Sequence, residues 1–244
     1  MLWPWKAPPH VNDGRQQVTR IVGEFSRFAQ SLAAAPDENT RLQLAVDSAV
    51  ALVASCDHAG ITINERGGLI TRVSSDDLVR RANELQHELG EGSCLDVRRD
   101  QNTFVTTDLA ADQRWPRWAP RVHDELGVGS MMSLLVFTDR HSFGALSLYA
   151  RHGHEFDADD VAVGQAVAGH LSVAVVADRQ LDQLGLGLAN RNMIGQAQGI
   201  LMERLDITAE QAFDFLRRAS MGLNRKVVDV AADIARSRTL PELP

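Results

Sequence analysis

The sequence has few aromatic residues and few cysteines for its length. Aromatic residues make up 5% of the 244 positions, whereas hydrophobic residues of all kinds make up 44%, so aliphatic side chains must do most of the core packing. The only cysteines are Cys56 and Cys94, and they form no CxxC pair. This pattern predicts two buried, reduced thiols and argues against a disulfide framework or a redox motif.

Long apolar runs are also lacking. The most apolar stretch, residues 161–177, includes Gln165, His170 and Ser172 and is shorter than the roughly 20 residues that a membrane-spanning helix needs. Residues 1–9 (MLWPWKAPP) contain no apolar core of the signal-peptide type. We therefore expect a cytoplasmic protein with no membrane partner.

The chain has no excess of positive charge and no catalytic pattern. Its net charge of −7 argues against a protein that coats nucleic acid along its whole surface, because phosphate binding needs local positive charge. We find no Ser, His and Asp order of a hydrolase and no Gly-rich phosphate loop. His152 and His154 are too few for a metal site. We expect no enzyme, no metal and no resident cofactor.

Helical and strand periodicities alternate along the first two thirds of the chain. After a disordered leader at residues 1–14, helices are expected at 17–32, 40–53 (with Thr40 as its cap), 77–89 and from 157 onward, with Asp157 as a cap. Strands are expected at 59–63, 69–74, 103–107, 130–138 and 145–150. Hairpins between short strands, with helices outside them, indicate an α+β domain with an antiparallel sheet.

Four segments of this region form a set, at residues 90–94 (GEGSC), 103–108, 112–118 (DQRWPRW) and 144–148 (GALSL). Together they resemble a GAF domain, over about residues 41–177. This resemblance implies a sensor or dimerisation domain, which we place with its N-terminal helix at residues 15–177. A small-molecule effector would lie against the sheet, under the helices around 78–94 and 114–126. The sequence does not identify that effector.

A long helix without proline is expected over residues 157–190. Its apolar positions alternate by four and three residues, as in a coiled coil, at Val163, Val167, His170, Ala174, Ala177, Leu181, Leu184 and Leu188. The first part of this seam, up to Ala177, has two interpretations, since it can pack on the domain's own sheet or on another helix. Leu181, Leu184 and Leu188 lie beyond the sheet. We expect them to pair with the same helix of a second subunit, although Gly185 and Gly187 weaken this end.

Residues 190–238 contain three short amphipathic helices. Thr208 and Gln211 fit a capping box, Gly222 is suited to end the second helix in a left-handed conformation, and Asn224 can cap the third. Gly199 suggests a close helix approach. The residues expected in the core are Ile194, Ala197, Ile200, Leu201, Leu205, Ala212, Phe213, Leu216, Ala219, Val227, Val230, Ala231 and Ile234.

These helices resemble the ANTAR module, a three-helix RNA-binding domain of bacterial regulators. The resemblance rests on residues 197–202 (AQGILM), on Ala212 and Phe213 with residues 216–218, and on Asn224 with residues 230–231. It implies binding to RNA stem-loops of nascent transcripts and prevention of terminator formation. The side chains expected to contact RNA are Gln198, Arg217, Arg218, Asn224, Arg225 and Lys226, with Arg191 and Arg204 as weaker candidates. Many members carry Lys where this chain has Gln198.

The charge of the C-terminal region limits this interpretation. From Arg191 to the end, eight basic and seven acidic residues give +1, so the rest of the chain carries −8. Asp214, Asp229 and Asp233 must therefore face away from RNA. The sequence predicts a transcription antitermination regulator that acts as a homodimer in signal transduction. The alternative is a signal-sensing scaffold whose helical C-terminus binds protein instead of RNA.

Overall fold

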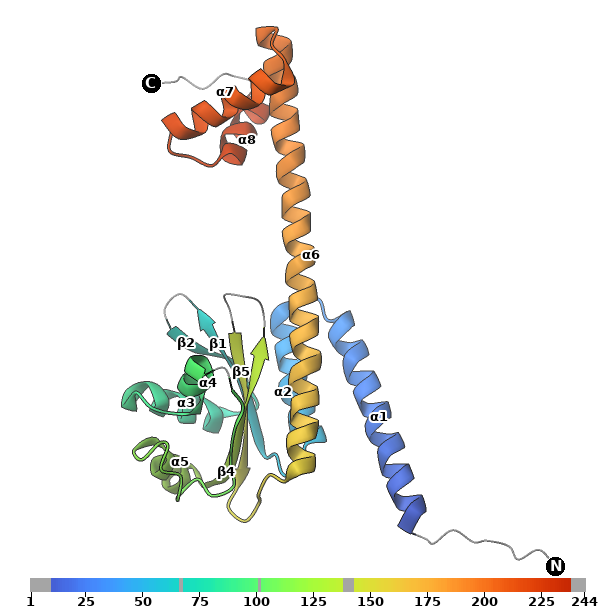
Figure 1. Cartoon of the computed structure of the whole chain (residues 1–244), viewed down its shortest axis with the longest axis vertical. Helices are drawn as coiled ribbons and strands as arrows, with labels where there is room; N and C mark the ends of the chain where they lie inside the picture. The colour runs from blue at the N-terminus through green and yellow to red at the C-terminus, as the bar shows by residue number, and fades with distance from the viewer. Residues whose placement is uncertain (1–9, 66–67, 101, 138–142, 238–244) are drawn as a thin grey trace, which may run out of the picture. The chain divides into compact units, whose positions relative to one another are not determined.

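The structure is a computed structural model that describes residues 10–65, 68–100, 102–137 and 143–237 (Figure 1). Its contacts divide the chain into two compact units, Met1–Asp178 and Arg179–Pro244, which are described separately. Residues 1–9 of the expected leader lie outside the described residues. Residues 10–14 of that leader belong to helix α1 (His10–Ala34), which begins earlier than the apolar spacing indicated.

A five-stranded antiparallel sheet forms the centre of the first unit, as the sequence predicts. Its order is β2-β1-β5-β4-β3. Leu146 of β5 pairs with Ile61 on one side and with Leu134 on the other, so the central strand joins the two hairpins. A register shift between Ile61 and Thr62 interrupts the pairing of β1 with β2. The strands are β1 (His58–Glu65), β2 (Gly68–Ser74), β3 (Phe104–Thr106), β4 (Val128–Phe137) and β5 (Phe143–Arg151).

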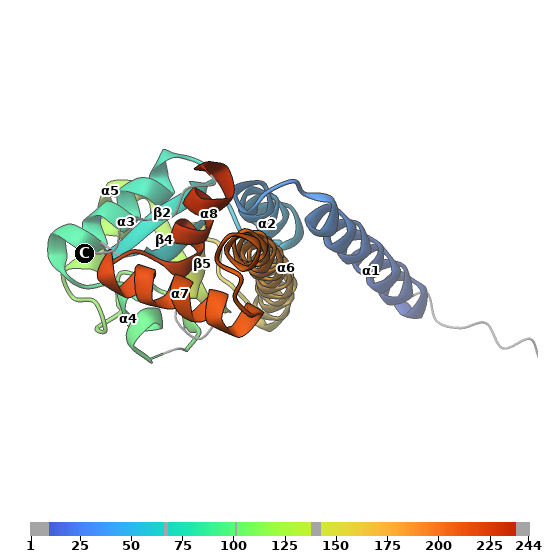
Figure 2. The ribbon, with the colours of Figure 1, turned by 90° about the horizontal axis from the view of Figure 1, so that it is seen from above.

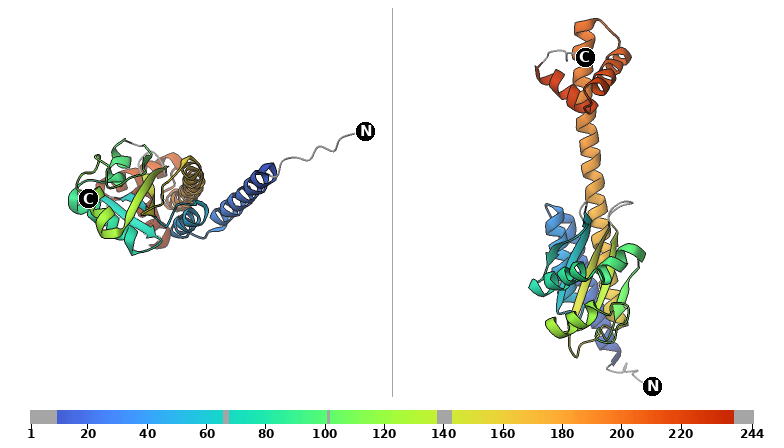
Figure 3. Two further views of the ribbon diagram at one scale, coloured as in Figure 1. Left: turned by 90° about the horizontal axis from the view of Figure 1, so that it is seen from below. Right: turned by 90° about the vertical axis from the view of Figure 1, so that its left-hand side faces the viewer.

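Helices cover both faces of this sheet (Figures 1, 2 and 3). Helix α2 (Glu38–Leu52) and the start of α6 (Ala158–Leu205) pack on one face, and α1 packs against these two helices. Apolar side chains of the three helices form the larger core with alternate residues of β5, including Leu146 and Leu148. The other face is covered by α3 (Asp77–Leu89), α4 (Ser93–Asp100) and α5 (Trp118–Leu126). Helix α4 was not predicted, because its eight residues contain too few apolar positions to show a period.

The first connection between helices uses a different cap from the one expected. The carboxylate of Asp37 accepts a hydrogen bond from the backbone N–H of Thr40 at 2.8 Å, so helix α2 starts at Glu38. The prediction that Thr40 caps this helix was wrong. Aspartate is among the strongest helix caps, and the carboxylate also receives the Thr40 hydroxyl.

A buried arginine ties three helices of the first unit together. The Arg41 guanidinium donates to the carbonyl of Leu32 at 3.2 Å and to that of Ala35 at 2.8 Å, at the C-terminal end of α1. The same side chain forms an ion pair with Asp178 of α6 at 2.7 Å. Carbonyl groups at a helix end lack partners within the helix, so Arg41 satisfies them without a glycine cap.

Helix α6 is one continuous helix, where the sequence predicted a connecting helix followed by a separate short helix. The connecting helix and the first ANTAR-like helix are one 48-residue helix, and Gly185 and Gly187 do not interrupt it. Asp157 caps its start by accepting the N–H of Asp160 at 2.9 Å, as predicted. By length and composition it could cross a membrane, since one stretch reaches a mean hydropathy of 1.5. However, Val167, Leu171 and Val175 are buried in the core of the first unit, as in a core helix of a globular domain.

The second unit contains the end of α6, helix α7 (Ala209–Gly222) and helix α8 (Val227–Ser237). The predicted capping box at Thr208 and Gln211 is confirmed in both directions. Most of the expected core is also found, with partly buried Ile194, Ile200 and Val227 around it. The fully buried members are Ala197, Leu201, Ala212, Leu216, Ala219, Val230, Ala231 and Ile234.

Four local predictions about this unit were wrong. Phe213 is 43% exposed and Leu205 is 38% exposed, so neither belongs to the core. A Cβ atom at Gly199 would meet no atom within 4 Å, so this glycine does not allow a close helix approach. Gly222 is not the left-handed residue; Asn224 has a φ of 50° instead, two residues later.

Replacing Arg41 with methionine should lower the free energy of unfolding by about 2–3 kcal/mol, because two helix-end carbonyls and Asp178 lose their donor in a mostly buried position. Urea unfolding followed by circular dichroism measures this. The control is Arg121→Met, which removes only exposed ion pairs with Glu88 and Glu125 and should cost less than about 1 kcal/mol. Equal effects of the two substitutions would contradict the role given to Arg41.

Candidate functional site

Four of the predicted RNA contacts lie at opposite ends of α7, and Arg217 and Arg218 lie between them on the helix. Gln198 of α6 lies against the first turn of α7, where its Nε2 donates to the Ala209 carbonyl at 3.0 Å. Asn224, Arg225 and Lys226 form the connection between α7 and α8. Helix α7 has 14 residues, which corresponds to roughly 20 Å at the usual rise per residue. The candidates therefore do not converge on one pocket, and any shared ligand must extend along α7.

Two of the predicted phosphate-binding arginines are paired with carboxylates. Arg217 contacts Asp214 at 3.2 Å on α7, and Arg225 contacts Asp233 of α8 at 2.6 Å. The sequence requires Asp214 and Asp233 to face away from RNA, but both lie beside arginines that are expected to contact it. Pairing of this kind follows from helix geometry for Arg217, since residues three positions apart are neighbours on a helix. A phosphate must compete with these carboxylates.

The connection between α7 and α8 is held by backbone hydrogen bonds. The Ser220 hydroxyl donates to the Arg225 carbonyl, and the Arg225 N–H donates to the Ser220 carbonyl at 3.0 Å. Asn224 occupies the left-handed region within this turn, which asparagine tolerates better than most residues. The prediction that Asn224 caps α8 was wrong, because α8 begins three residues later, at Val227. Its side chain is exposed.

The remaining candidate cations are exposed and unpaired within the part of the chain that the structure describes. Arg191, Arg204, Arg218 and Lys226 all belong to this group. Arg191 lies seven residues before Gln198, so both side chains occupy one face of α6, whereas Arg204 lies six residues after Gln198 and occupies another. Arg218 is turned about 100° around α7 from Arg217.

The predicted dimer seam is exposed. Leu181, Leu184 and Leu188 are 68%, 65% and 61% exposed, which is unusual for three leucines on one face of a helix. Leu186 is also exposed, but it lies on the opposite side of α6 from this seam. Of the earlier seam positions, Val167 is buried in the core on the sheet and Val163 and Ala174 are partly buried beside it, whereas His170 and Ala177 are exposed. The first of the two interpretations therefore holds for part of this half of the seam.

The face of the sheet under α3 and α4 contains a buried polar network. The Gln86 amide donates to Asn83 at 3.0 Å and accepts from the Cys94 N–H at 2.9 Å. The Ser133 hydroxyl contacts both Ser93 and Ser147 at 2.9 Å. The space left beside Gln86 and Cys94 is about 10 Å³, which is at the lower limit for one water molecule. Among the residues that the structure describes, side chains therefore fill this part of the region where an effector was expected.

One polar atom of this interior is unsatisfied. The hydroxyl of Tyr149 is buried and has no hydrogen-bond partner of good geometry. Burial raises the pKa of this phenol well above its usual value, the nearby Cys94 adds to the rise, and Ser147 acts in the opposite direction. The hydroxyl therefore stays protonated at neutral pH and is available as a donor to a group that enters the interior.

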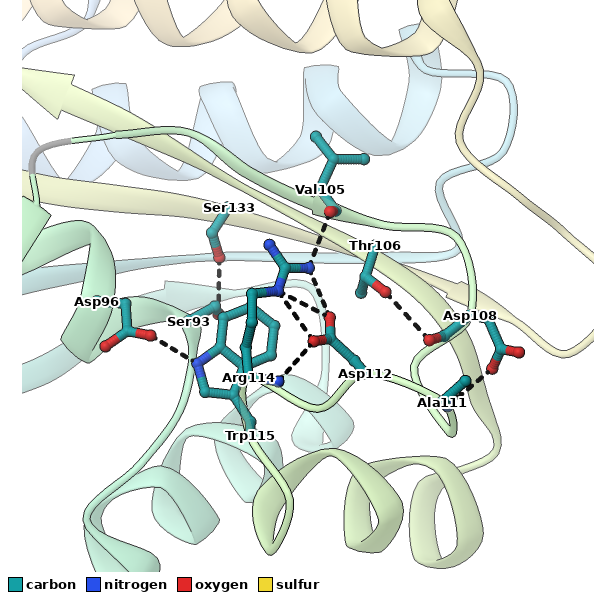
Figure 4. Close-up of polar contacts among 10 residues, drawn as sticks. All are labelled: Ser93, Asp96, Val105, Thr106, Asp108, Ala111, Asp112, Arg114, Trp115 and Ser133. Atoms are coloured by element: carbon teal, nitrogen blue, oxygen red, sulfur yellow. Dashed lines mark hydrogen bonds and ion pairs between the residues drawn. The ribbon is translucent and has the colours of Figure 1, made fainter.

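The loop of residues 112–118 is fixed to its surroundings by polar contacts, as Figure 4 shows. Arg114 pairs with Asp112, donates to the Val105 carbonyl at 3.0 Å and lies over the Trp115 ring, with its central guanidinium carbon 4.6 Å from the ring centre. The Trp115 indole donates to Asp96 of α4 at 2.8 Å. Burial opposes ionisation of Asp112, but hydrogen bonds from Arg114 outweigh it and lower the pKa of this carboxyl. The loop thus closes over the interior beside α4.

Glu91 connects this loop to the turn before α4. Its Oε1 accepts the N–H groups of Arg117 and Trp118 at 2.5 and 2.7 Å, which satisfies the first donors of α5. Partial burial acts against ionisation, but these backbone hydrogen bonds and the one from the Arg117 side chain lower the pKa of Glu91. The sequence indicated Glu91 only as part of a motif, because its partners lie 26 and 27 residues away.

Neither cysteine has the surroundings of a nucleophile. Both thiols are buried. Burial raises the pKa of Cys56 to about 12, which keeps it protonated. Within residues 10–65, 68–100, 102–137 and 143–237, no three His, Cys, Asp or Glu side chains are grouped to hold a metal. His152 packs on the His123 ring, and His154 contacts Asp57 at 3.2 Å.

Comparison with protein families assigns both units. The family model of the GAF domain matches residues 35–176, and that of the ANTAR domain matches residues 182–234. The chain belongs to the GAF-domain family and carries an ANTAR domain after it. ANTAR is an RNA-binding antiterminator domain and GAF is a sensing or dimerisation domain, so this combination is a regulatory architecture. No curated protein matches the chain.

Solved structures resemble the chain in fold. The GAF domain of a sensor histidine kinase from Pseudomonas syringae is 16% identical with a TM-score of 0.50, and covers 72% of this chain and 98% of its own. An N-acylhomoserine-lactone-dependent LuxR-family transcription factor from Burkholderia cenocepacia is also 16% identical, with a TM-score of 0.51, and covers 67% and 99%. At this identity the likeness extends to the fold of the first unit alone.

Gly92→Ala should destabilise the GAF domain by about 2 kcal/mol more than Gly68→Ala. Both glycines have φ values that other residues rarely adopt, 146° and 129°, but only at Gly92 would the new Cβ overlap the Gln86 side chain. Thermal unfolding measured by circular dichroism compares the two. Equal losses of stability in the two variants would mean that the Gln86 side chain can move aside without destabilising the domain.

Proposed function

We propose that this protein is an RNA-binding transcription antitermination regulator of the cytoplasm. The match of residues 182–234 to the ANTAR domain carries the proposal. Exposed cations at Arg218 and Lys226, and the exposed turn at Asn224, support it. Side chains of these types contact phosphates and base edges in RNA loops, whose bases are unstacked and accessible.

Binding must depend on a few placed side chains, because the domain is nearly neutral. Arg217 and Arg225 are held by Asp214 and Asp233 in the free protein. An RNA phosphate that takes either arginine therefore breaks an ion pair and leaves a carboxylate near the RNA. The expected consequence is moderate affinity that falls with increasing salt.

A homodimer would place two ANTAR domains on one RNA. The exposed stripe of Leu181, Leu184 and Leu188 supports this, because burial of three leucines against a second helix removes their apolar area from water. Two linked domains gain affinity for two linked stem-loops through effective concentration. The GAF domain would control the dimer in response to a small molecule that rearranges the interior around Gln86 and Tyr149.

Asp233→Asn should raise the affinity for RNA by about two- to fivefold, because it frees Arg225 from an exposed ion pair worth up to about 1 kcal/mol. The assay measures binding of the full-length protein to a library of two-hairpin RNAs with randomised loops, at several salt concentrations.

The matched control for this prediction is Asp229→Asn, which removes the same charge from α8 without releasing an arginine. Its effect should be smaller than that of Asp233→Asn. If the wild type binds RNA and the two variants have equal affinity, Arg225 is not a phosphate contact. If the wild type binds no RNA in the library, the proposed function is wrong and the protein-binding alternative is favoured.

The substitution Leu184→Asp should convert dimers to monomers, because it places a charge in the centre of the apolar seam. Leu186→Asp changes an equally exposed leucine on the other side of α6 and should leave the dimer intact. Sedimentation equilibrium of both variants and the wild type decides this. A dimer that survives Leu184→Asp must use a different surface.

A further inference from the structure

We propose that a groove between α6 and the first turns of α7 binds one unpaired nucleobase of an RNA loop, with Phe213 as its stacking platform. The nucleobase would be one with an exocyclic amino group. This inference rests on the proposed RNA-binding function. It adds a contact to a base, whereas the predicted arginine contacts are to phosphates.

The groove is open and large enough for a planar base. Its volume is about 510 Å³, within the range of about 300–1,000 Å³ that small-molecule sites occupy. It lies at the end of α7 opposite to the turn with Asn224, next to the contact between Gln198 and Ala209. The lining residues are Gln198, Ala209, Glu210, Gln211, Phe213 and Asp214.

Packing of the domain does not explain why an aromatic residue stands at position 213. The core of the second unit is formed without it, and 43% of its surface remains exposed. A free aromatic ring at the wall of a groove offers a flat apolar face. Every nucleobase has a complementary face, and stacking of this kind contributes strongly to binding of single-stranded nucleic acid.

The polar atoms of the groove favour a base over a phosphate. Glu210 and Asp214 supply carboxylates, which repel phosphate and accept hydrogen bonds from amino groups. Gln198 uses its amide nitrogen on the Ala209 carbonyl, so its amide oxygen is left as a further acceptor among the described residues. Three acceptors around one aromatic ring suit adenine, cytosine or guanine, which carry amino groups, better than uracil.

Arg217 places a positive charge next to this groove. It follows Phe213 by four residues, so the two side chains are neighbours on α7. A base stacked on Phe213 therefore has a guanidinium beside it that can contact the phosphate of the same nucleotide. The same charge disfavours the other ligand that a carboxylate-rich aromatic groove suits, a basic side chain of a protein partner.

A thermodynamic cycle between Phe213 and the RNA loop tests this inference. The probe is a two-hairpin RNA selected from the randomised-loop library by the wild-type protein, together with copies in which one loop nucleotide at a time is abasic. The protein variants are Phe213→Leu, which keeps apolar area but loses the ring, and Phe213→Tyr, which keeps the ring. Met221→Ala is the control, because Met221 is 66% exposed on α7 and does not line the groove.

Phe213→Leu should weaken binding by about tenfold, whereas Phe213→Tyr and Met221→Ala should change it less than about threefold. At one loop position the abasic RNA should cost the wild type about tenfold and the Phe213→Leu protein almost nothing, because the two changes remove the same contact. That position should be A, C or G in the selected RNAs. Circular dichroism melting checks that each variant is folded.

Two results would overturn the inference alone. One is unchanged RNA affinity of Phe213→Leu, and the other is equal sensitivity of the wild type and Phe213→Leu to every abasic position. In both cases RNA binding by the wild type stands. Absence of any selected RNA would instead refute the proposed function, and the groove proposal would fall with it.

Discussion

Both domains depend on one shared helix. Helix α6 gives Val167, Leu171 and Val175 to the core of the GAF domain, and it gives Ala197 and Leu201 to the core of the ANTAR domain. Neither core is complete without it. The residues between these contributions are helical, and the leucines at 181, 184 and 188 lie in this stretch, which belongs to neither core. A change in how α6 packs on the GAF sheet therefore alters a helix that also forms part of the ANTAR core.

Arg41 of α2 links the part of α6 in the GAF domain to helix α1. Its guanidinium joins the last carbonyls of α1 to Asp178 of α6 and is almost excluded from solvent. A lysine could not replace it. The guanidinium is a planar fork that donates to three separate acceptors, whereas the ammonium of lysine is a single compact group. This role could not be predicted from the sequence, because the partners of Arg41 lie up to 137 positions away.

The features that could be predicted from the sequence are those set by local chemistry. Alternation of apolar residues located the five strands, and the Thr208 and Gln211 capping box located the start of α7. The failures have a different cause. Phe213 has the spacing of a core residue, but smaller residues such as Ala212 and Ala219 already fill the interior, so the ring remains outside. Helix α4 shows no apolar period because its eight residues contain few apolar positions.

The sequence predicted which residues belong to the candidate site but not how they are arranged in space. Resemblance to a family identified the arginines, but which of them a carboxylate holds is a property of the folded surface. Asp233 on α8 pairs with Arg225, which lies eight residues earlier in the turn between α7 and α8. A strongly basic domain attracts any phosphate backbone and gains little selectivity from doing so. Here paired arginines reduce that general attraction, while Gln198 and Phe213 offer contacts that only an exposed base can use. If the protein has the proposed function, the low charge of this domain favours recognition of unpaired loops over binding to duplex RNA.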